Sequence, residues 1–427
     1  MEIIKMKYEK NIIDVSIPKK NLLKVLTSNE QTEEKTEEDM ILNALKNPIG
    51  TKPLKDIVKA KEKICIIISD ITRAWQKMNV FLPYILEELY KGGVDEKDIT
   101  FLCATGSHRK QTNQEHRILL GDLLDKFEVI DHDCYDQKNL VYLGETSFHN
   151  PVYIHKKAIE SDHVILTGAI IFHDLAGWGG GRKSILPGIS GYETIMFNHA
   201  LALNPNIGDG INEEVRCGNI DKNPIHLDMM EACHMVKPSF LFNVVINEKG
   251  NIAHAVAGHY DQAHEVGTKI VDEFDGVLIQ EKADVVIASA GGYPKDINLY
   301  QASKALSNMK ECVKVGGYIV LLAQCTEGIG NEDMRQIIED YENNIQRERA
   351  LRKDFTVSKY IAYMIAEMAQ KYKIILVSEM DSKVMQRIGI IVVKEIREAL
   401  DQIKMKKSPK IYLAPQGANI LPRIKEK

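Results

Sequence analysis

Polar side chains follow several apolar runs of this chain directly. Asp70, Thr72 and Arg73 lie just beyond the run Ile64–Ile68. The planar guanidinium of an arginine can bond two oxygens of a carboxylate or phosphate at once. These residues are therefore candidates for binding an anionic ligand. A helix cap with a surface ion pair would use the same residue types, so that interpretation stays open.

A histidine follows a second apolar run, Ile99–Ala104. It is His108, in the segment A-T-G-S-H-R, where Gly106 permits a tight turn or the close approach of a ligand. An imidazole at the end of a strand could do general acid–base work near neutral pH. The alternative is a structural or surface histidine.

The segment Phe172–Ser184, F-H-D-L-A-G-W-G-G-G-R-K-S, contains four glycines in five positions. Their backbone N–H groups are expected to be free to surround an anion such as phosphate. The order resembles a P-loop, but that motif requires glycine directly before the lysine, and Arg182 stands there. Lys183 could instead anchor a cofactor covalently, and His173 and Lys183 frame the glycine segment.

Two further segments contain candidate ligands. His199 lies in M-F-N-H-A, and imidazole is a common ligand of nickel, copper and zinc, although a core or capping histidine is the alternative. Gln301 and Lys304 are three residues apart and would share one face of a helix, where they could hold a substrate carboxylate. Lys295, in G-G-Y-P-K-D, competes for the lysine role.

The elements that must position these residues are short, buried strands alternating with helices. Predicted strands are Ile64–Ile68, Ile99–Ala104, Val164–Phe172, Val285–Ser289, Tyr318–Ala323 and Ile374–Val377. Predicted helices include Val80–Lys91 and Asn331–Asp340, and Phe240–Ile246 with Ile252–Ala257 predicts a hairpin. This alternation predicts an α/β protein: two α/β domains, residues 1–270 and 271–427, with mainly parallel sheets and an active-site cleft between them.

The composition is that of an ordinary folded protein, with 44% hydrophobic residues, 27% charged residues and a formal net charge of −5 over 427 residues. The negative charge argues against nucleic-acid binding. No apolar run is long enough to predict a membrane-spanning helix. The seven cysteines form no CxxC pair, which favours reduced thiols and a cytoplasmic location over disulfides or a zinc site.

Taken together, these motifs resemble the nickel-dependent lactate racemase family. The resemblance rests on D-x-T-R at Asp70, A-T-G-x-H-R at His108, H-x9-K from His173 to Lys183, N-H-A at His199, and G-G-Y-P-K-D followed by Q-x-x-K. Each motif alone is weak, whereas all of them in this order are specific. Trp178 departs from the pattern and could reshape the pocket.

The resemblance implies a nickel-pincer nucleotide cofactor, covalently linked to Lys183 as a thioamide, with His199 as the protein ligand of nickel. It implies that His108 and His173 form the acid/base pair. Residues implied to contact the nucleotide are Asp70, Thr72, Gly179, Gly180 and Gly181. Residues implied to contact the substrate carboxylate or its neighbourhood are Arg73, Gln301 and Lys304, with Lys295 as the alternative lysine.

The implied activity is that of a racemase or epimerase, an isomerase that inverts C2 of a 2-hydroxy acid by hydride transfer through a 2-keto acid. Cofactor biosynthesis proteins would be its partners. Two alternatives remain. One is a nucleotide-phosphate-binding transferase or ATPase that uses the glycine-rich segment. The other is a carrier that binds the nickel nucleotide without turnover and has no need of His108 and His173.

Overall fold

The computed structural model describes residues 1–29, 35–404 and 408–425. The chain divides into unit 1, which comprises Met1–Gln31, Ala202–Gly218 and Asp272–Lys427, and unit 2, which comprises Thr32–Leu201 and Asn219–Val271. The boundary predicted between residues 270 and 271 lies beside the junction at Val271 and Asp272. The N-terminal segment and Ala202–Gly218, however, belong with the C-terminal part, so the division into 1–270 and 271–427 differs from these units.

Unit 2 is built on a six-stranded sheet with the strand order β13-β12-β9-β4-β5-β6. Neighbouring strands from β12 to β6 run parallel, and β13 pairs antiparallel with β12 at one edge. The strands are β4 (Ile64–Ser69), β5 (Ile99–Ala104), β6 (Glu128–Asp131), β9 (His163–Ala169), β12 (Phe240–Ile246) and β13 (Ile252–Gly258). Central strand β4 reads Ile-Cys-Ile-Ile-Ile because both of its faces are buried.

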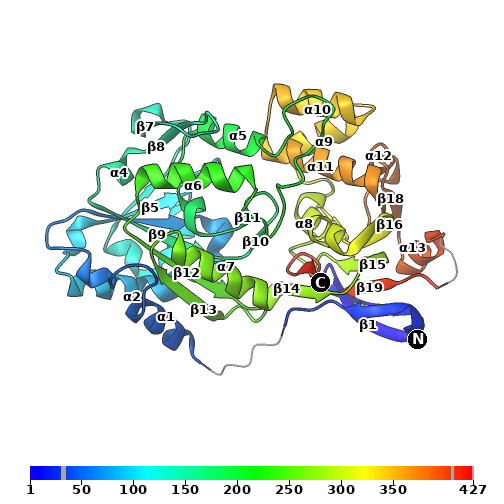
Figure 1. The fold of residues 1–427 in the computed structure, drawn as a ribbon, viewed down its shortest axis with the longest axis horizontal. Helices are drawn as coiled ribbons and strands as arrows, with labels where there is room; N and C mark the ends of the chain where they lie inside the picture. The colour runs from blue at the N-terminus through cyan, green and yellow to red at the C-terminus, as the bar shows by residue number, and fades with distance from the viewer. Residues whose placement is uncertain (30–34, 405–407, 426–427) are drawn as a thin grey trace. The chain divides into compact units, whose positions relative to one another are not determined.

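Helices and two small ribbons complete unit 2 (Figure 1). The helices are α1 (Glu37–Lys46), α2 (Met78–Lys91), α3 (Asn113–Leu120), α4 (Lys156–Ile159), α5 (Tyr192–Ala200), α6 (Pro224–Val236) and α7 (Gln262–Asp275), the last of which continues into unit 1. The ribbons are β7 (Leu140–Glu145) with β8 (Pro151–His155) and β10 (Phe172–His173) with β11 (Gly177–Trp178). Apolar side chains of α1 and α2 share a core with one face of β4, including Ile41, Phe81 and Ile66.

Unit 1 contains a second six-stranded sheet, entirely parallel, with the order β18-β17-β16-β15-β19-β3. Its strands are β3 (Leu22–Val25), β15 (Ala283–Ser289), β16 (Val313–Leu322), β17 (Lys373–Val377), β18 (Ile391–Val393) and β19 (Ile411–Ala414). The hairpin β1 (Glu2–Tyr8) and β2 (Asn11–Ile17) contacts this sheet at β15, and β14 (Gly276–Ile279) pairs with β20 (Leu421–Ile424). The helices are α8 (Leu299–Met309), α9 (Glu332–Glu339), α10 (Asn344–Lys353), α11 (Val357–Lys371), α12 (Ser382–Gln386) and α13 (Ile396–Gln402).

The predicted α/β class and the predicted strands are confirmed, with one exception. The run Val164–Phe172 is apolar throughout, but β9 ends at Ala169. Beyond that point Phe172 and His173 change partner and pair with Trp178 and Gly177. A continuous apolar run therefore contains both the end of a sheet strand and the start of a separate ribbon, which hydropathy alone does not separate.

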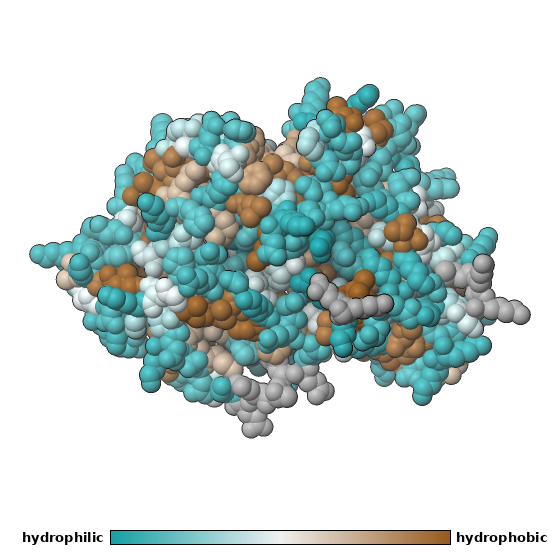
Figure 2. All heavy atoms as spheres, in the orientation of Figure 1, coloured by the Kyte–Doolittle hydropathy of each residue, from teal (hydrophilic) through white to brown (hydrophobic). Residues whose placement is uncertain are grey.

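Hydrophilic residues predominate on the face drawn in Figure 2, with apolar residues in small scattered groups. All seven cysteines are buried, and none forms a disulfide within the described residues. Across the described ranges, no helix is both long and apolar enough to cross a membrane.

Candidate active site

The candidate catalytic residues of unit 2 follow three neighbouring strands. Strands β9, β4 and β5 are adjacent and parallel, so their carboxyl ends lie at the same edge of the sheet. Asp70 comes directly after β4, His108 follows β5, and His173 follows β9. This edge is where open α/β sheets bind their ligands.

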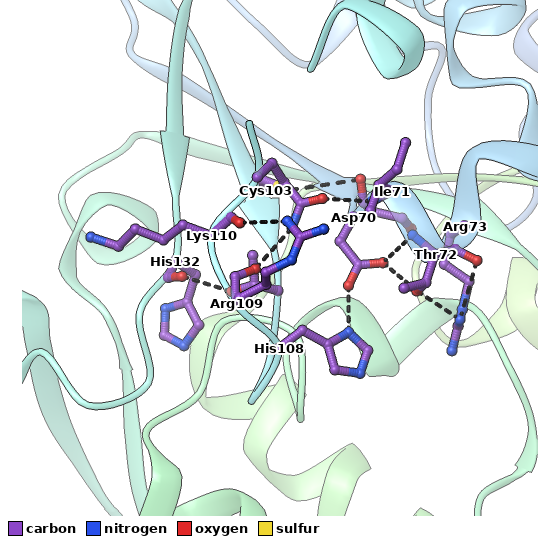
Figure 3. Close-up of polar contacts among 12 residues, drawn as sticks. Asp70, Ile71, Thr72, Arg73, Cys103, His108, Arg109, Lys110 and His132 are labelled. Carbon is purple, nitrogen blue, oxygen red and sulfur yellow. Dashed lines mark hydrogen bonds and ion pairs between the residues drawn. The ribbon is translucent and has the colours of Figure 1, made fainter. Parts of the chain in front are cut away.

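The side chain of His108 points at the carboxylate of Asp70 (Figure 3). Its Nδ1 and the Asp70 Oδ2 form a short hydrogen bond. Asp70 itself is 3% exposed, whereas the His108 side chain is 53% exposed. A carboxylate that accepts from Nδ1 fixes the ring orientation and leaves Nε2 to exchange protons with a ligand. The pair is therefore arranged for acid–base chemistry at Nε2 of His108.

The other oxygen of Asp70 caps the short helical segment Ile71–Gln76 by accepting from the backbone N–H of Thr72 at 3.1 Å. Burial alone would raise the pKa of Asp70, but hydrogen bonds from His108 and Thr72 outweigh it and lower the pKa. Arg73 donates to the hydroxyl of Thr72 at 2.9 Å and is otherwise exposed. Because protein donors already occupy both carboxylate oxygens, the contacts of Asp70 point to orienting His108, a role that the sequence did not predict.

His173 and Lys183 are brought together, with Nε2 of the ring 3.1 Å from the lysine Nζ. The backbone N–H groups of Leu175 and Ala176 donate to the ring Nδ1, at 3.2 and 3.3 Å. The pKa of His173 lies well below its ordinary value because of burial and the cationic charges of Lys183 and Arg73. The pKa of Lys183 is lowered to about 7, first by burial and then by the positive charges of Arg182 and Arg73.

His199 lies in α5 and is 5% exposed. Its Nδ1 is 2.9 Å from the carbonyl oxygen of Ile195, to which it donates. Burial, followed by the charge of Lys183, lowers the pKa of His199 to about 4, so the ring is neutral near pH 7. Within the described ranges its Nε2 has no hydrogen-bond partner, and the lone pair on that nitrogen can coordinate a metal.

The glycine-rich segment differs from the expected anion cradle. The N–H of Gly179 donates to the carbonyl of Ile171, and that of Gly181 donates to the Asn243 side chain, both at 2.8 Å. A Cβ on Gly180 would lie 2.6 Å from the Asn243 Oδ1. The expectation of free N–H groups is therefore wrong at Gly179 and Gly181. The glycines allow the turn to pack closely against β12, and this removes the main support for the ATPase alternative.

This turn is held by three side chains that were not candidates from the sequence. Asn223 donates to the carbonyl of Leu175 at 2.7 Å, and the ring of His264 is 2.9 Å from the carbonyl oxygen of Gly179. Asn243 accepts from the turn as described above. The one local signal was a polar Asn243 within the apolar strand F-L-F-N-V-V-I. Asn223, which caps α6, and His264, which lies in α7, are far along the chain.

Trp178 packs within unit 2 as part of the ribbon that carries His173. It is 6% exposed, and its ring centroid lies 5.7 Å from that of Phe172 across the ribbon. These contacts give it a structural role in holding the ribbon.

The remaining candidates belong to unit 1. Gln301 and Lys304 share one face of α8, as predicted, and the lysine Nζ donates to the Gln301 Oε1 at 2.7 Å. Lys295 is exposed and donates to the side chain of Asn419. Among the residues that the structure describes, no three His, Cys, Asp or Glu side chains are grouped to hold a metal ion. A metal bound at His199 therefore needs ligands from another source.

Comparison with known proteins gives a consistent result over nearly the whole chain. Residues 8–210 match the model of the lactate racemase N-terminal domain, and residues 278–421 match that of the lactate racemase C-terminal domain. The chain is 32% identical over 434 residues to a lactate racemase from Thermoanaerobacterium thermosaccharolyticum, with 99% of each chain covered. It is 31% identical over 437 residues to a lactate racemase from Lactiplantibacillus plantarum, covering 99% of this chain and 100% of that protein.

Comparison with solved structures gives the same result as the comparison of sequences. The fold is similar to that of the lactate racemase apoprotein from Thermoanaerobacterium thermosaccharolyticum, with a TM-score of 0.90, 32% identity, and coverage of 99% of this chain and 100% of that one. A protein from Thermotoga maritima shares the fold at a TM-score of 0.63 and 17% identity, covering 93% of this chain and 100% of that one.

Proposed function

Because this chain belongs to the lactate racemase family and is an isomerase of the racemase class, we propose that it inverts C2 of lactate or a closely related 2-hydroxy acid. The observation that carries the proposal is the contact between His173 and Lys183. An acid–base group lies 3.1 Å from a lysine amine, on the same sheet edge as the Asp70–His108 pair.

The residues of unit 2 fit a nickel-pincer nucleotide. The amine of Lys183, with its pKa near 7, suits the nitrogen of a thioamide formed with a thiocarboxylic acid group of the cofactor, with loss of water. The neutral His199 offers Nε2 to nickel, and the cofactor sulfurs would provide further ligands. When bound, the nickel nucleotide supplies an acceptor for the C2 hydrogen together with its two electrons.

The chain's own residues bind the substrate and move the hydroxyl proton. The C2 hydrogen of a 2-hydroxy acid is a very weak acid, so loss as hydride, with transfer of the hydroxyl proton to a base, avoids a carbanion. Arg73 has the exposed guanidinium that can hold the substrate carboxylate while the C2 substituents exchange places. Gln301 and Lys304 of α8, with Lys295 as the alternative lysine, are proposed as further contacts of the substrate or its neighbourhood.

Two histidines serve the two faces of the planar 2-keto acid. His108 takes or returns the proton at Nε2, because Asp70 holds its Nδ1. His173 is the acid–base group proposed for the other face, and the backbone N–H groups of Leu175 and Ala176 hold its ring. A carrier that never turns over would need neither histidine, whereas inversion needs both.

We further propose that the protein works in the cytoplasm, since buried cysteines without disulfides among the described residues suit a reducing compartment, and that cofactor biosynthesis proteins supply the nucleotide. The test is intact-protein mass spectrometry, with nickel analysis, after co-production with such proteins. We expect a covalent mass increase that peptide mapping places on Lys183, and about one nickel per chain. An unmodified Lys183 and no nickel would contradict the cofactor assignment.

The activity is tested separately with a panel of enantiopure 2-hydroxy acids and chiral chromatography. We expect the loaded protein to convert either enantiomer of one member of the panel into the racemate. Lys183→Ala should abolish conversion, and full activity of that variant would show that covalent attachment is unnecessary.

A further inference from the structure

Arg182, beside Lys183 in the chain, is a buried cation that makes no hydrogen bond to a carboxylate among the described residues, although the charge of Asp261 acts on it. It is 1% exposed and, within the described part of the chain, forms no ion pair. Its guanidinium donates to the carbonyl oxygen of Ala176 at 2.6 Å and to that of Gly180 at 3.4 Å, and it lies 3.0 Å from the ring Nε2 of His264. Its Nε has no partner. A buried charge whose hydrogen bonds go only to carbonyl oxygens and an imidazole is costly, so its position calls for an explanation.

The neighbouring lysine provides that explanation. Two cations in one water-poor site repel each other, and the group that releases its proton more readily becomes neutral. Although burial lowers the pKa of Arg182 to about 9, the guanidinium stays charged at neutral pH. Lys183, with its pKa near 7, is then the group that gives up its proton.

Hydrogen bonds around His173 lead independently to the same protonation state. Because backbone N–H groups donate to Nδ1, the single proton of the neutral ring lies on Nε2. That Nε2–H faces the Lys183 Nζ at 3.1 Å, where it needs the lone pair of an uncharged amine as acceptor. One of the donors at Nδ1 is the N–H of Ala176, whose carbonyl Arg182 holds. Arg182 therefore also fixes the turn that sets the tautomer of His173.

The other charged groups that act on Lys183 do not reverse this balance. Arg73 adds to the repulsion, whereas the carboxylate of Asp174 opposes it with a smaller effect. The Oδ1 of Asp174 lies 3.1 Å from the Nδ1 of His173, a contact that is an ion pair only when the ring is protonated. His199 is neutral near pH 7 and contributes little charge.

We propose that Arg182 is a positioning residue that keeps Lys183 an uncharged, nucleophilic amine aimed at His173. The importance of this state rests on the proposed role of Lys183 as the attachment point, but the state itself belongs to the apoprotein. This proposal gives a role to Arg182, the residue that stands where a P-loop requires glycine.

The test measures the amine directly. The full-length apoprotein, made without cofactor biosynthesis proteins, is acetylated with trace acetic anhydride between pH 5 and 11, and peptide mass spectrometry follows each lysine. We expect Lys183 to label with a midpoint near pH 7, far below that of exposed Lys269 in the same sample. If Lys183 labels with the profile of Lys269, the proposal is overturned without the need for any variant.

The variants Arg182→Met and Arg182→Gln should raise the Lys183 midpoint by about one pH unit or more, which corresponds to roughly tenfold less labelling at neutral pH. The matched control is Arg347→Met in unit 1. Arg347 is also buried, at 2% exposed, and bonds the carbonyls of Ile337, Tyr341 and Arg387. It should lower the melting temperature and leave the Lys183 profile unchanged.

An unchanged midpoint in folded Arg182 variants, or an equal shift in the Arg347 control, would refute the proposed role. The proposed function fails in a different way. A low midpoint in the apoprotein, with no cofactor attached after co-production, would leave the role of Arg182 intact and remove the cofactor assignment.

Discussion

Replacing Asp70 by Asn tests whether this carboxylate orients His108 or binds the nucleotide. In the variant the amide oxygen can still accept from Thr72. The amide nitrogen, however, would face the Nδ1 of His108 in place of the carboxylate oxygen. Two donors cannot share a hydrogen bond, so the ring is expected to switch tautomer and place its proton on Nε2, the atom that must accept the hydroxyl proton.

The size of the effect follows from the loss of one acid–base group. A positioned general acid–base contributes about 10²- to 10⁴-fold to a rate. The His108 side chain is 53% exposed, so water can partly restore the productive tautomer, and we expect a loss of kcat toward the lower end, about 10²- to 10³-fold. Nickel content and attachment at Lys183 should stay at the level of the unaltered protein, since neither depends on His108.

The assay follows initial rates from both enantiomers by chiral chromatography. Since the equilibrium constant of racemisation is one, kcat/KM must fall equally in both directions. Thr72→Val is the control, because it removes a hydrogen bond but keeps the carboxylate, and it should cost less than about tenfold. Activity of Asp70→Asn within a few-fold of the unaltered protein would refute the orienting role. Loss of nickel or cofactor would favour the nucleotide contact that the sequence predicted.

Three other expectations concern the same unit. Gly180→Ala should destabilise unit 2 by about 2–4 kcal/mol in urea unfolding, because strain at positive φ adds to a clash with Asn243. The control Gly250→Ala has a similar φ and nothing within 4 Å of the added Cβ, and it should cost only about 1 kcal/mol. Equal losses of stability in the two variants would contradict this packing. His108→Ala and His173→Ala should each lose turnover and keep nickel, and nickel loss in both would make them ligands. Between pH 7 and pH 5 the unfolding free energy should fall by about 2 kcal/mol per buried neutral ring, since burial lowers the folded pKa and the unfolded chain binds the extra protons. A flat profile would be inconsistent with neutral burial of His132, His199, His226 and His264.

Sequence patterns predicted the strands because buried parallel strands are continuous apolar runs. Ile64–Ile68 and Ile99–Ala104 are found as β4 and β5 almost to the residue. Because Asp70 and His108 follow the ends of these two strands, their position at one edge of a sheet could be inferred as well. The pairing of Gln301 with Lys304 followed from helical spacing alone. Such inferences succeed because each depends on residues close together in the chain.

What the sequence could not provide were contacts between distant segments. The hydrogen bond from His108 turns Asp70 into an orienting group, although 38 residues separate them. The glycine turn is held by Asn243 and His264, which lie on β12 and α7. Free glycine N–H groups are a reasonable expectation from composition, but packing against those elements occupies them. The division into units likewise depends on the chain returning to unit 1 at Ala202–Gly218.

The central claim is that the C2 hydrogen leaves and returns as hydride within one active site. The most direct measurement uses lactate, or the accepted 2-hydroxy acid, with deuterium at C2 and the loaded protein in ordinary water. Mass spectrometry of the separated enantiomers then gives the deuterium content of the inverted product. We predict that the inverted product keeps its deuterium, because hydride does not exchange with water. Replacement by solvent hydrogen at the rate of inversion would contradict the account and indicate proton abstraction at C2.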